Sequence, residues 1–280
     1  MKRRVKGGWQ LTKKSWSALR DNRGLGKFPV LGALFALIPT VLLTLPGIVL
    51  LSDDKTAPGV AAVAVGIYLS TLAVTFFAVG LAGAADAVFR GEPDAPRAGF
   101  ALARSRFRAI CGWAFISALL GALFNLLESE ENIGAQIVGA LLGAAWALVT
   151  FLAIPVIAIE GTGPIETVKR SVSIFRQRWG EQITGQVSIG GIVFLIGFLP
   201  ALLLIAVGIY LAINESSSTG LAGGGVLIAA GVIVFVLAAV VASALRGIFG
   251  VALYRFAVEG HGSGPFTTED LERAVATKGR

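Results

Sequence analysis

Residues 221–245, LAGGGVLIAAGVIVFVLAAVVASAL, contain no charged side chain in 25 positions. About 20 apolar residues in a helix cross the roughly 30 Å hydrocarbon layer of a bilayer. Transmembrane strands would instead alternate apolar and polar residues, so this run predicts a transmembrane helix. Five further stretches have the same character: Phe28–Leu51, Val60–Ala84, Ala109–Leu127, Gly134–Ile159 and Ile183–Ala212. The sequence therefore predicts an all-α, polytopic membrane bundle of six transmembrane helices.

The composition of the 280-residue chain excludes a soluble globular protein. Hydrophobic residues make up 55% and charged residues only 15%, whereas soluble domains carry roughly 25% charged residues. One cysteine, Cys111, excludes an internal disulfide framework, and one histidine, His261, leaves little for metal chemistry. The sequence also lacks the motifs of serine hydrolases, zinc proteases and P-loop enzymes. We therefore expect no enzymatic activity, no cofactor and no metal site.

The positions of the basic residues indicate the orientation of the helices. Of the 24 Lys and Arg residues, 23 lie on one side of the six stretches, and Lys55 alone lies on the other. Basic residues are enriched on the cytoplasmic side of membrane proteins. The charges therefore predict a cytoplasmic segment at 1–27, a six-helix domain at 28–258 and a cytoplasmic tail at 259–280.

Three of the cytoplasmic segments, one before each pair of spans, have helical amphipathic periodicity. They lie within 1–27, near 97–108 and near 164–179. Their predicted apolar faces are Val5, Trp9, Thr12, Trp16 and Leu19 in the first, Phe100, Ala103, Phe107 and Ile110 in the second, and Ile165, Val168, Val172, Phe175 and Trp179 in the third. Two interpretations fit the pattern: basic segments that only hold the topology, or an internal triplication of a helix followed by a hairpin.

Helices with one aromatic-aliphatic face and one basic face lie in the plane of the membrane interface. Trp sits at headgroup level, and long basic side chains reach toward the phosphates. We therefore expect in-plane helices whose side chains contact lipid headgroups. The predicted contact residues are Trp9, Trp16, Arg20, Arg104, Arg108, Lys169, Arg170, Trp179, Arg246 and Arg255.

The third segment starts with a turn whose residues have defined roles. Gly161 and Gly163 supply backbone freedom after the fourth span, which ends beside Glu160. Pro164 suits the first helical position. The carboxylate of Glu166 then lies in the first turn, where it interacts favourably with the helix dipole. Glu166 can also pair with Lys169 or Arg170. This motif is either only a turn and a helix start, or the beginning of a cytoplasmic docking helix.

The tail is predicted to hold a short helix near 268–276. Thr267 precedes Asp270 by three positions, which is the spacing of a capping box, and Phe266 can pack on Leu271. His261 lies in the glycine-rich link before it and is interpreted as a solvated linker residue.

The predicted spans carry no ionisable residue at mid-membrane, which argues against an ion-coupled carrier. Asp86, Glu160 and Arg246 fall near span ends, where we expect water to reach them. Proline interrupts three spans, and hydroxyls are the main polar groups inside them. For a carrier, we would expect a cavity lined by Thr40, Thr75 or the Pro200 region.

Four motifs resemble an uncharacterised family of bacterial six-span membrane proteins. They are Trp9-Gln10-Leu11-Thr12-Lys13-Lys14-Ser15-Trp16, the stretch from Glu160-Gly161 to Lys169-Arg170-Ser171, Trp179-Gly180-Glu181 and Ala252-Leu253-Tyr254-Arg255. The stretch after Glu160 is also similar to the membrane domain attached to some glycerophosphodiester phosphodiesterases. No stretch resembles their soluble domain, so the similarity implies no such activity. The resemblance implies a bacterial plasma-membrane location.

These observations predict a non-enzymatic membrane protein that acts as a lipid-interacting scaffold or accessory subunit through its cytoplasmic helices. The expected partners are membrane lipids and a second copy or a larger membrane complex, and not nucleic acid. The alternative is a transporter or channel for an apolar or lipid-like solute.

Overall fold

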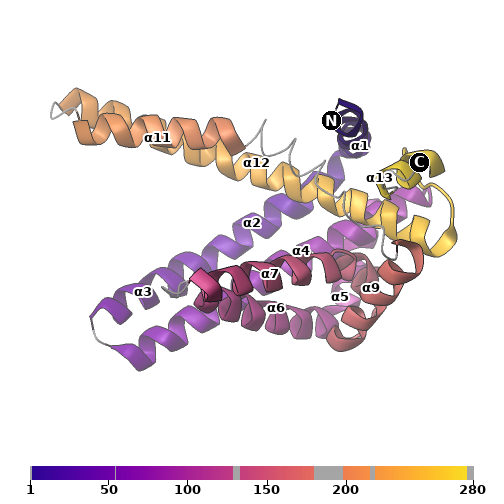
Figure 1. Ribbon diagram of the computed structural model, residues 1–280, viewed down its shortest axis with the longest axis horizontal. Helices are drawn as coiled ribbons and strands as arrows, with labels where there is room; N and C mark the ends of the chain where they lie inside the picture. The colour runs from indigo at the N-terminus through magenta and orange to yellow at the C-terminus, as the bar shows by residue number, and fades with distance from the viewer. Residues whose placement is uncertain (1, 54, 129–132, 180–197, 215–217, 276–280) are drawn as a thin grey trace.

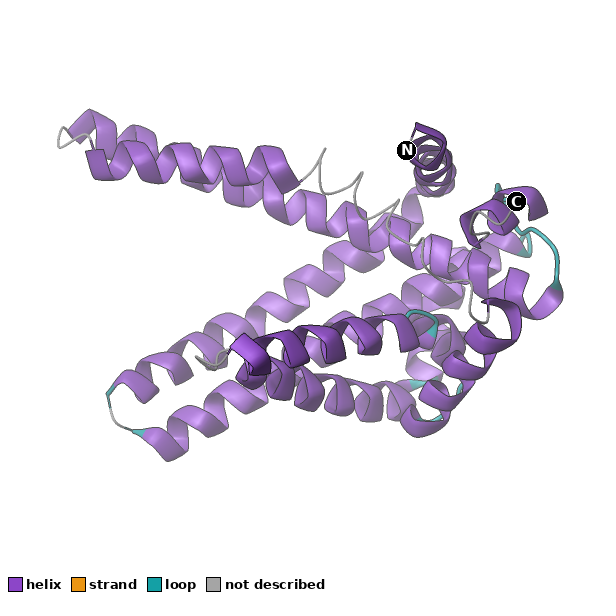
Figure 2. Ribbon diagram, in the orientation of Figure 1, coloured by secondary structure: helices purple, strands orange, loops and turns teal. Residues whose placement is uncertain are grey.

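The computed structural model describes residues 2–53, 55–128, 133–179, 198–214 and 218–275 (Figure 1). In these residues all regular structure is helical, and the loops between helices are short (Figure 2). Four helical rods are long and apolar enough to cross a membrane: Arg23–Ser52, Thr56–Phe89, Phe107–Leu127 and Ala222–Glu259. The prediction of an all-α bundle of apolar helices is confirmed.

The helices follow one another in a simple order along the chain. The α-helices are α1 (Lys2–Asp21), α2 (Lys27–Pro39), α3 (Leu45–Ser52), α4 (Thr56–Phe89), α5 (Ala95–Ser105), α6 (Phe107–Glu128), α7 (Ile133–Val149), α8 (Ala153–Ile159), α9 (Pro164–Trp179), α11 (Leu199–Asn214), α12 (Ser218–Glu259) and α13 (Thr268–Val275). A 3-10 turn, η1 (Arg23–Gly26), precedes α2, and a π-helical turn, η2 (Thr40–Thr44), joins α2 to α3.

Prolines divide two of the predicted spans. In the first, the π-helical turn lies between Pro39 and Pro46, because a proline cannot donate the hydrogen bond that an α-helix requires four residues back. The predicted span Phe28–Leu51 nevertheless remains within one helical rod, whereas the predicted continuous span Gly134–Ile159 is wrong. It breaks at residues 150–152, and Pro155 falls in the first turn of a new helix, α8, where its missing N–H is tolerated. Of the predicted span Ile183–Ala212, residues 183–197 lie outside the described residues.

The predicted segment 97–108 is also shorter than expected. Helix α5 ends at Ser105, Arg106 forms a turn, and Arg108 lies in the first turn of α6. Asp94 caps α5 by accepting a hydrogen bond from the backbone N–H of Arg97 at 3.3 Å. Chain direction therefore changes at Arg106, so α5 and α6 are separate helices.

Tight packing is concentrated at one end of the molecule, where α1, α5, α9 and α13 gather (Figure 1). We call this the basic end, because α1, α5 and α9 carry exposed Lys and Arg side chains. The largest fully buried side chains belong to the parts of the helices and turns that meet at this end: Leu25, Phe28, Val79, Leu81, Ile110, Leu152, Val156, Ile157, Ile248, Leu253, Phe266 and Leu271. They form one core that joins the ends of α2, α4, α6, α8 and α12.

Beyond this core, the helices expose large apolar side chains. Leu34 on α2, Leu119 on α6, Leu141 on α7 and Leu237 on α12 are each about half exposed or more. The hairpin of α11 and α12 extends away from the other helices (Figure 1), and its two helices cross where Gly208 and Gly224 face each other. A Cβ on Gly208 would lie 2.8 Å from the Gly224 carbonyl oxygen. Apolar surface on this scale needs lipid or another protein to cover it.

Glycine permits a close contact between α4 and α5 at the basic end. The carbonyl oxygen of Gly80 on α4 occupies the position that a Cβ on Gly99 of α5 would take. We predict that Gly99→Ala forces α5 away from α4 and destabilises the protein by about 1–3 kcal/mol, as expected for overpacking. The measurement is thermal unfolding in detergent.

Gly121→Ala is the matched control, because Gly121 lies on α6 with open space where its Cβ would be. Alanine is the better helix former, so this variant should unfold at the same temperature or slightly higher. Equal unfolding temperatures for the two variants would contradict the close contact between α4 and α5.

Candidate lipid-headgroup interface

Helix α1 presents an outward stripe of aromatic and basic side chains. Trp9, Lys13, Trp16 and Arg20 follow one another at steps of four, three and four residues, so they share one face. Trp9 is 41% exposed and Trp16 is 48% exposed. The Lys13 ammonium lies 5.4 Å from the centre of the Trp9 ring, within the range of a cation–π contact. The predicted headgroup residues of this helix therefore stand together on its surface.

The opposite face of α1 attaches the helix to the protein. Leu11, Ser15 and Ala18 are buried there, and the helix packs against α12 and α13. Sequence analysis did not single out this second face, because two of its three side chains are small and one is polar. The structure thus separates an inward face of small side chains from an outward face that carries Trp and basic residues.

Helix α13 holds α1 in place from the other end of the chain. Lys14 pairs with Asp270, which lies 256 positions away. The Thr267 backbone N–H donates to Asp270 Oδ2 at 2.9 Å, and Thr267 Oγ1 accepts from the Asp270 N–H at 3.3 Å. Phe266 and Leu271 are both buried. The predicted capping box and the predicted short helix in the tail are confirmed for the described residues.

The turn before α9 has the predicted geometry with a different ion pair. Gly161 has φ +71°, and α9 begins at Pro164, as expected. Arg170, however, does not pair with Glu166: its Nε lies 2.8 and 2.9 Å from the two carboxylate oxygens of Glu160. The hydrogen bond to Glu160 raises the pKa of Arg170. The Tyr254 hydroxyl donates to the same carboxylate at 2.7 Å, so Glu160 links α9 to α12.

Arg106, which lies in the turn between α5 and α6, supports the turn before α9. Its guanidinium packs against Gly161, where a Cβ would overlap it. Its Nε and Nη2 point at the carbonyl oxygens of Ala158 and Ile159, at 3.4 and 3.5 Å. A cation next to the last carbonyls of a helix is stabilised by the helix dipole. Gly161 is therefore needed both for its positive φ and for the room it leaves to Arg106.

A second ion-pair cluster joins α4 to α12. Asp86 Oδ1 lies 3.4 Å from Arg255 Nη1, and Asp86 Oδ2 lies 3.2 Å from Arg90 Nη2. Arg255 also contacts Glu259 at 3.2 Å. The expectation that water reaches Asp86 is wrong, because the residue is only 8% exposed. A buried carboxylate requires such partners, since an unpaired one would be costly.

The predicted headgroup residues whose side chains the structure describes therefore divide into two groups. Arg170 and Arg255 are engaged in ion pairs that hold helices together. Trp179 ends α9, and its side chain is outside the described part of the structure. The other predicted residues are exposed at the basic end: Trp9, Trp16, Arg20, Arg104, Arg108, Lys169 and Arg246. Glu166 and Gly163, from the turn motif, are exposed as well.

Sequence reasoning missed Lys14, Arg106 and the partners of Asp86. The four-residue spacing of Asp86 and Arg90 is a local signal that could have identified that pair. No local signal identifies the two distant pairs, because Asp86 and Arg255 are 169 positions apart and Lys14 and Asp270 are 256 apart. Spacing rules address residues within one helix, whereas these pairs depend on how separate helices pack. Among the described residues, no group of three His, Cys, Asp or Glu side chains is close enough to hold a metal ion.

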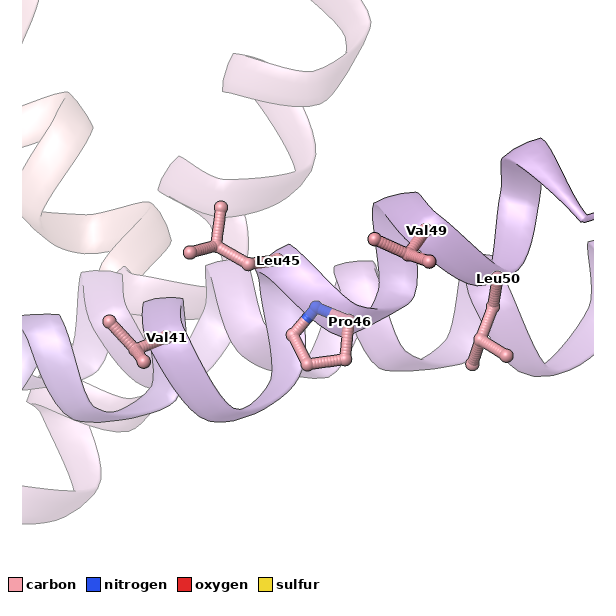
Figure 3. A pocket seen from close by; sticks show the side chains of 5 residues that line it. All are labelled: Val41, Leu45, Pro46, Val49 and Leu50. Carbon is pink, nitrogen blue, oxygen red and sulfur yellow. The ribbon is translucent and has the colours of Figure 1, made fainter. Parts of the chain in front are cut away.

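Two apolar hollows lie along the first helical rod, one at Pro46 and one at Pro39. One, of about 510 Å³, is lined by Val41, Leu45, Pro46, Val49 and Leu50 (Figure 3). The other, of about 560 Å³, lies beside Pro39 between η2, α4 and Phe107. Neither is lined by Thr40 or Thr75. The Thr40 hydroxyl donates to the Ala36 carbonyl at 2.8 Å, and that of Thr75 donates to Thr71 at 2.7 Å.

Comparison with known protein families gives one finding. The sequence profile of a family of unknown function, DUF6159, matches residues 58–264, from the third residue of α4 to beyond the end of α12. No curated protein and no solved structure matches the chain.

The contact between α1 and α13 should depend on the charge of Asp270. Burial opposes its ionisation, but hydrogen bonds from Lys14 and Thr267 outweigh burial and lower its pKa to about 2. Because this pKa lies below the ordinary value of 3.8, the stabilisation is complete above pH 3.8 and is lost as the pH falls through about 2. We predict that Asp270→Ala weakens the docking of α13 by about 1–2 kcal/mol at neutral pH.

The measurement is hydrogen exchange of the backbone amides of α13. Glu272→Ala is the control, since Glu272 is exposed on the same helix. At neutral pH, the protection of the α13 amides should fall in Asp270→Ala but not in Glu272→Ala. Near pH 2, the protection in Asp270→Ala should match that in the unmodified protein. Unchanged protection in Asp270→Ala would show that the ion pair and the cap do not hold α13 to α1.

Proposed function

The chain belongs to DUF6159, a family of unknown function, and from its own side chains we propose that it is a lipid-interacting scaffold or accessory subunit of the bacterial plasma membrane. In this proposal it has no enzymatic activity and crosses the membrane six times, with both termini in the cytoplasm. The four long apolar helices would supply four crossings. The predicted spans Gly134–Ile159, in which a turn separates α7 from α8, and Ile183–Ala212, of which only residues 198–212 are described, would supply the other two.

One observation carries the proposal: the exposed stripe of Trp9, Lys13, Trp16 and Arg20 on α1. Two exposed Trp rings on a soluble surface would be unfavourable, but the membrane interface is the environment that Trp prefers. Basic side chains near an anionic leaflet each contribute about 1 kcal/mol of attraction. The helix is attached by its other face, so the stripe is left available to lipid.

The charge distribution supports the same orientation. The exposed cations of α1, α5 and α9 lie at the basic end, next to the termini of the apolar helices. A helix in this position lies across the bundle end, where headgroups meet the hydrocarbon layer. The protein would in this way fix anionic lipid, or a partner that binds such lipid, at the cytoplasmic surface.

The stripe can be tested by measuring its depth in a bilayer. In a Cys111→Ala background, Trp16→Cys is labelled with an environment-sensitive fluorophore, and the full-length protein is placed in vesicles containing phosphatidylglycerol. We expect lipids brominated near the headgroup to quench the label strongly, because α1 would lie at that depth.

Asp21→Cys is the control position, since Asp21 is exposed on α1 but lies outside the stripe. Its label should be quenched less than the label at position 16. If both labels respond only to water-soluble quenchers, α1 stands clear of the lipid and the proposal fails.

The hollow of about 560 Å³ beside Pro39 favours a second function, the passage of an apolar or lipid-like solute. Phe76, Phe77 and Phe107 contribute aromatic walls to it. If a solute moves there, Ala73→Trp should fill the hollow and slow the transbilayer movement of a fluorescent short-chain phospholipid. Ala140→Trp, at an exposed position of α7, should not. Movement no faster than in protein-free vesicles would contradict this second function.

A further inference from the structure

Three eight-residue segments in α1, α5 and α9 have matching residues. They are KKSWSALR at 13–20, RAGFALAR at 97–104 and KRSVSIFR at 169–176. Each begins with a basic residue, has Ser or Gly at the third position and ends with Arg. Each also precedes a pair of apolar helices. The match is therefore between segments that occupy the same place in three successive units of the chain.

The structure gives the matching positions the same surroundings. The third residue is buried in all three helices: Ser15 and Ser171 are at most 1% exposed, and Gly99 is buried against Gly80. A small residue is needed here because the helix approaches its neighbour closely, as the overlap of a Cβ on Gly99 with the Gly80 carbonyl shows. The three helices thus attach to the bundle through equivalent positions.

The second position is used for attachment in two of the three helices. Lys14 pairs with Asp270, and Arg170 pairs with Glu160. In α5 this position is Ala98, and the close packing of Gly99 takes the place of an ion pair. The basic residues of the second position are therefore already engaged inside the protein.

The first and last residues, in contrast, point outward in every copy. These six cations are all exposed, and none forms an ion pair with a described residue: Lys13, Arg20, Arg97, Arg104, Lys169 and Arg176. Residues seven apart lie within about 20° of each other around a helix and about 10.5 Å apart along it. Each helix therefore presents one pair of cations on one outward line.

We propose that the chain is a triplicated unit with three equivalent positions for anionic phospholipid headgroups, one on each outward cation pair. This inference rests on the proposed function, and it extends it from α1 to α5 and α9. The ligand chemistry is a phosphodiester headgroup, since paired cations attract the anionic phosphate. The apolar neighbours Trp16 and Phe107, each 48% exposed, favour a lipid over a soluble phosphate.

Three paired variants of the full-length protein test the inference: Lys13→Gln with Arg20→Gln, Arg97→Gln with Arg104→Gln, and Lys169→Gln with Arg176→Gln. Each protein is taken from nanodiscs of phosphatidylglycerol and phosphatidylcholine, and the retained lipids are counted by native mass spectrometry. Because the pairs lie on separate helices, their effects should add. Each variant should lose about a third of its phosphatidylglycerol and keep its phosphatidylcholine.

Arg23→Gln with Lys27→Gln is the matched control, since it removes the same charge from exposed positions next to α1 but outside the three segments. It should retain phosphatidylglycerol. An equal loss in this control would overturn the inference by showing a general basic surface. A parallel incubation with inorganic phosphate distinguishes the two sources of the anion: displacement of lipid by phosphate alone would overturn the assignment to lipid.

The remaining outcomes separate this inference from the proposed function. If only the pair on α1 affects lipid retention, the triplicated site is wrong while the proposed function stands. If no pair affects it but the label at position 16 is quenched by brominated lipid, the inference fails alone. If that label is not quenched, both fail. Unchanged helicity by circular dichroism in all four variants excludes unfolding as the cause.

Discussion

Three helices, α1, α5 and α9, lie close against the ends of the apolar helices, and this packing holds the molecule together. Ser15, Gly99 and Ser171 are small and buried, so α1, α5 and α9 lie directly on the bundle. The largest buried side chains, such as Phe28, are found at the same end. Elsewhere the helices expose apolar side chains that a bilayer would cover at no cost. Packing at one end thus determines both the position of the helices and the side chains that they leave outside.

Electrostatics divides the basic residues into two groups with different tasks. Arg170 pairs with Glu160 across the turn between α8 and α9, and Arg255 pairs with Asp86, which lies 169 positions away. The buried carboxylate of Asp86 needs such a partner, and both cations are engaged inside the protein and are not available to lipid. Cations at the first and last positions of the three segments face outward instead. The same residue types therefore act as internal connections on one side of a helix and as a headgroup surface on the other.

The sequence predicted the helices well because apolar length and capping are local properties. The all-α bundle, the start of α9 at Pro164 and the Thr267–Asp270 cap all follow from residues close in the chain. Continuity of the fourth span was predicted wrongly, because the length of an apolar run does not show that the chain turns at residues 150–152 and starts a new helix before Pro155. The burial of Asp86 and the partner of Arg170 depend on contacts between helices, which no periodicity reports. The inward face of α1 was missed because Ser15 and Ala18 contribute little to an apolar pattern.

In the proposed arrangement, three equivalent helices rest on the lipid surface with their outward cations at the same level. The most direct measurement is the bilayer depth of spin labels placed one at a time at Lys13, Arg97 and Lys169, the first position of each segment, in the full-length protein. We expect all three labels to lie at the headgroup level, at depths that agree within about one helical turn, 5.4 Å. Labels at clearly different depths, or labels exposed only to the aqueous phase, would contradict it.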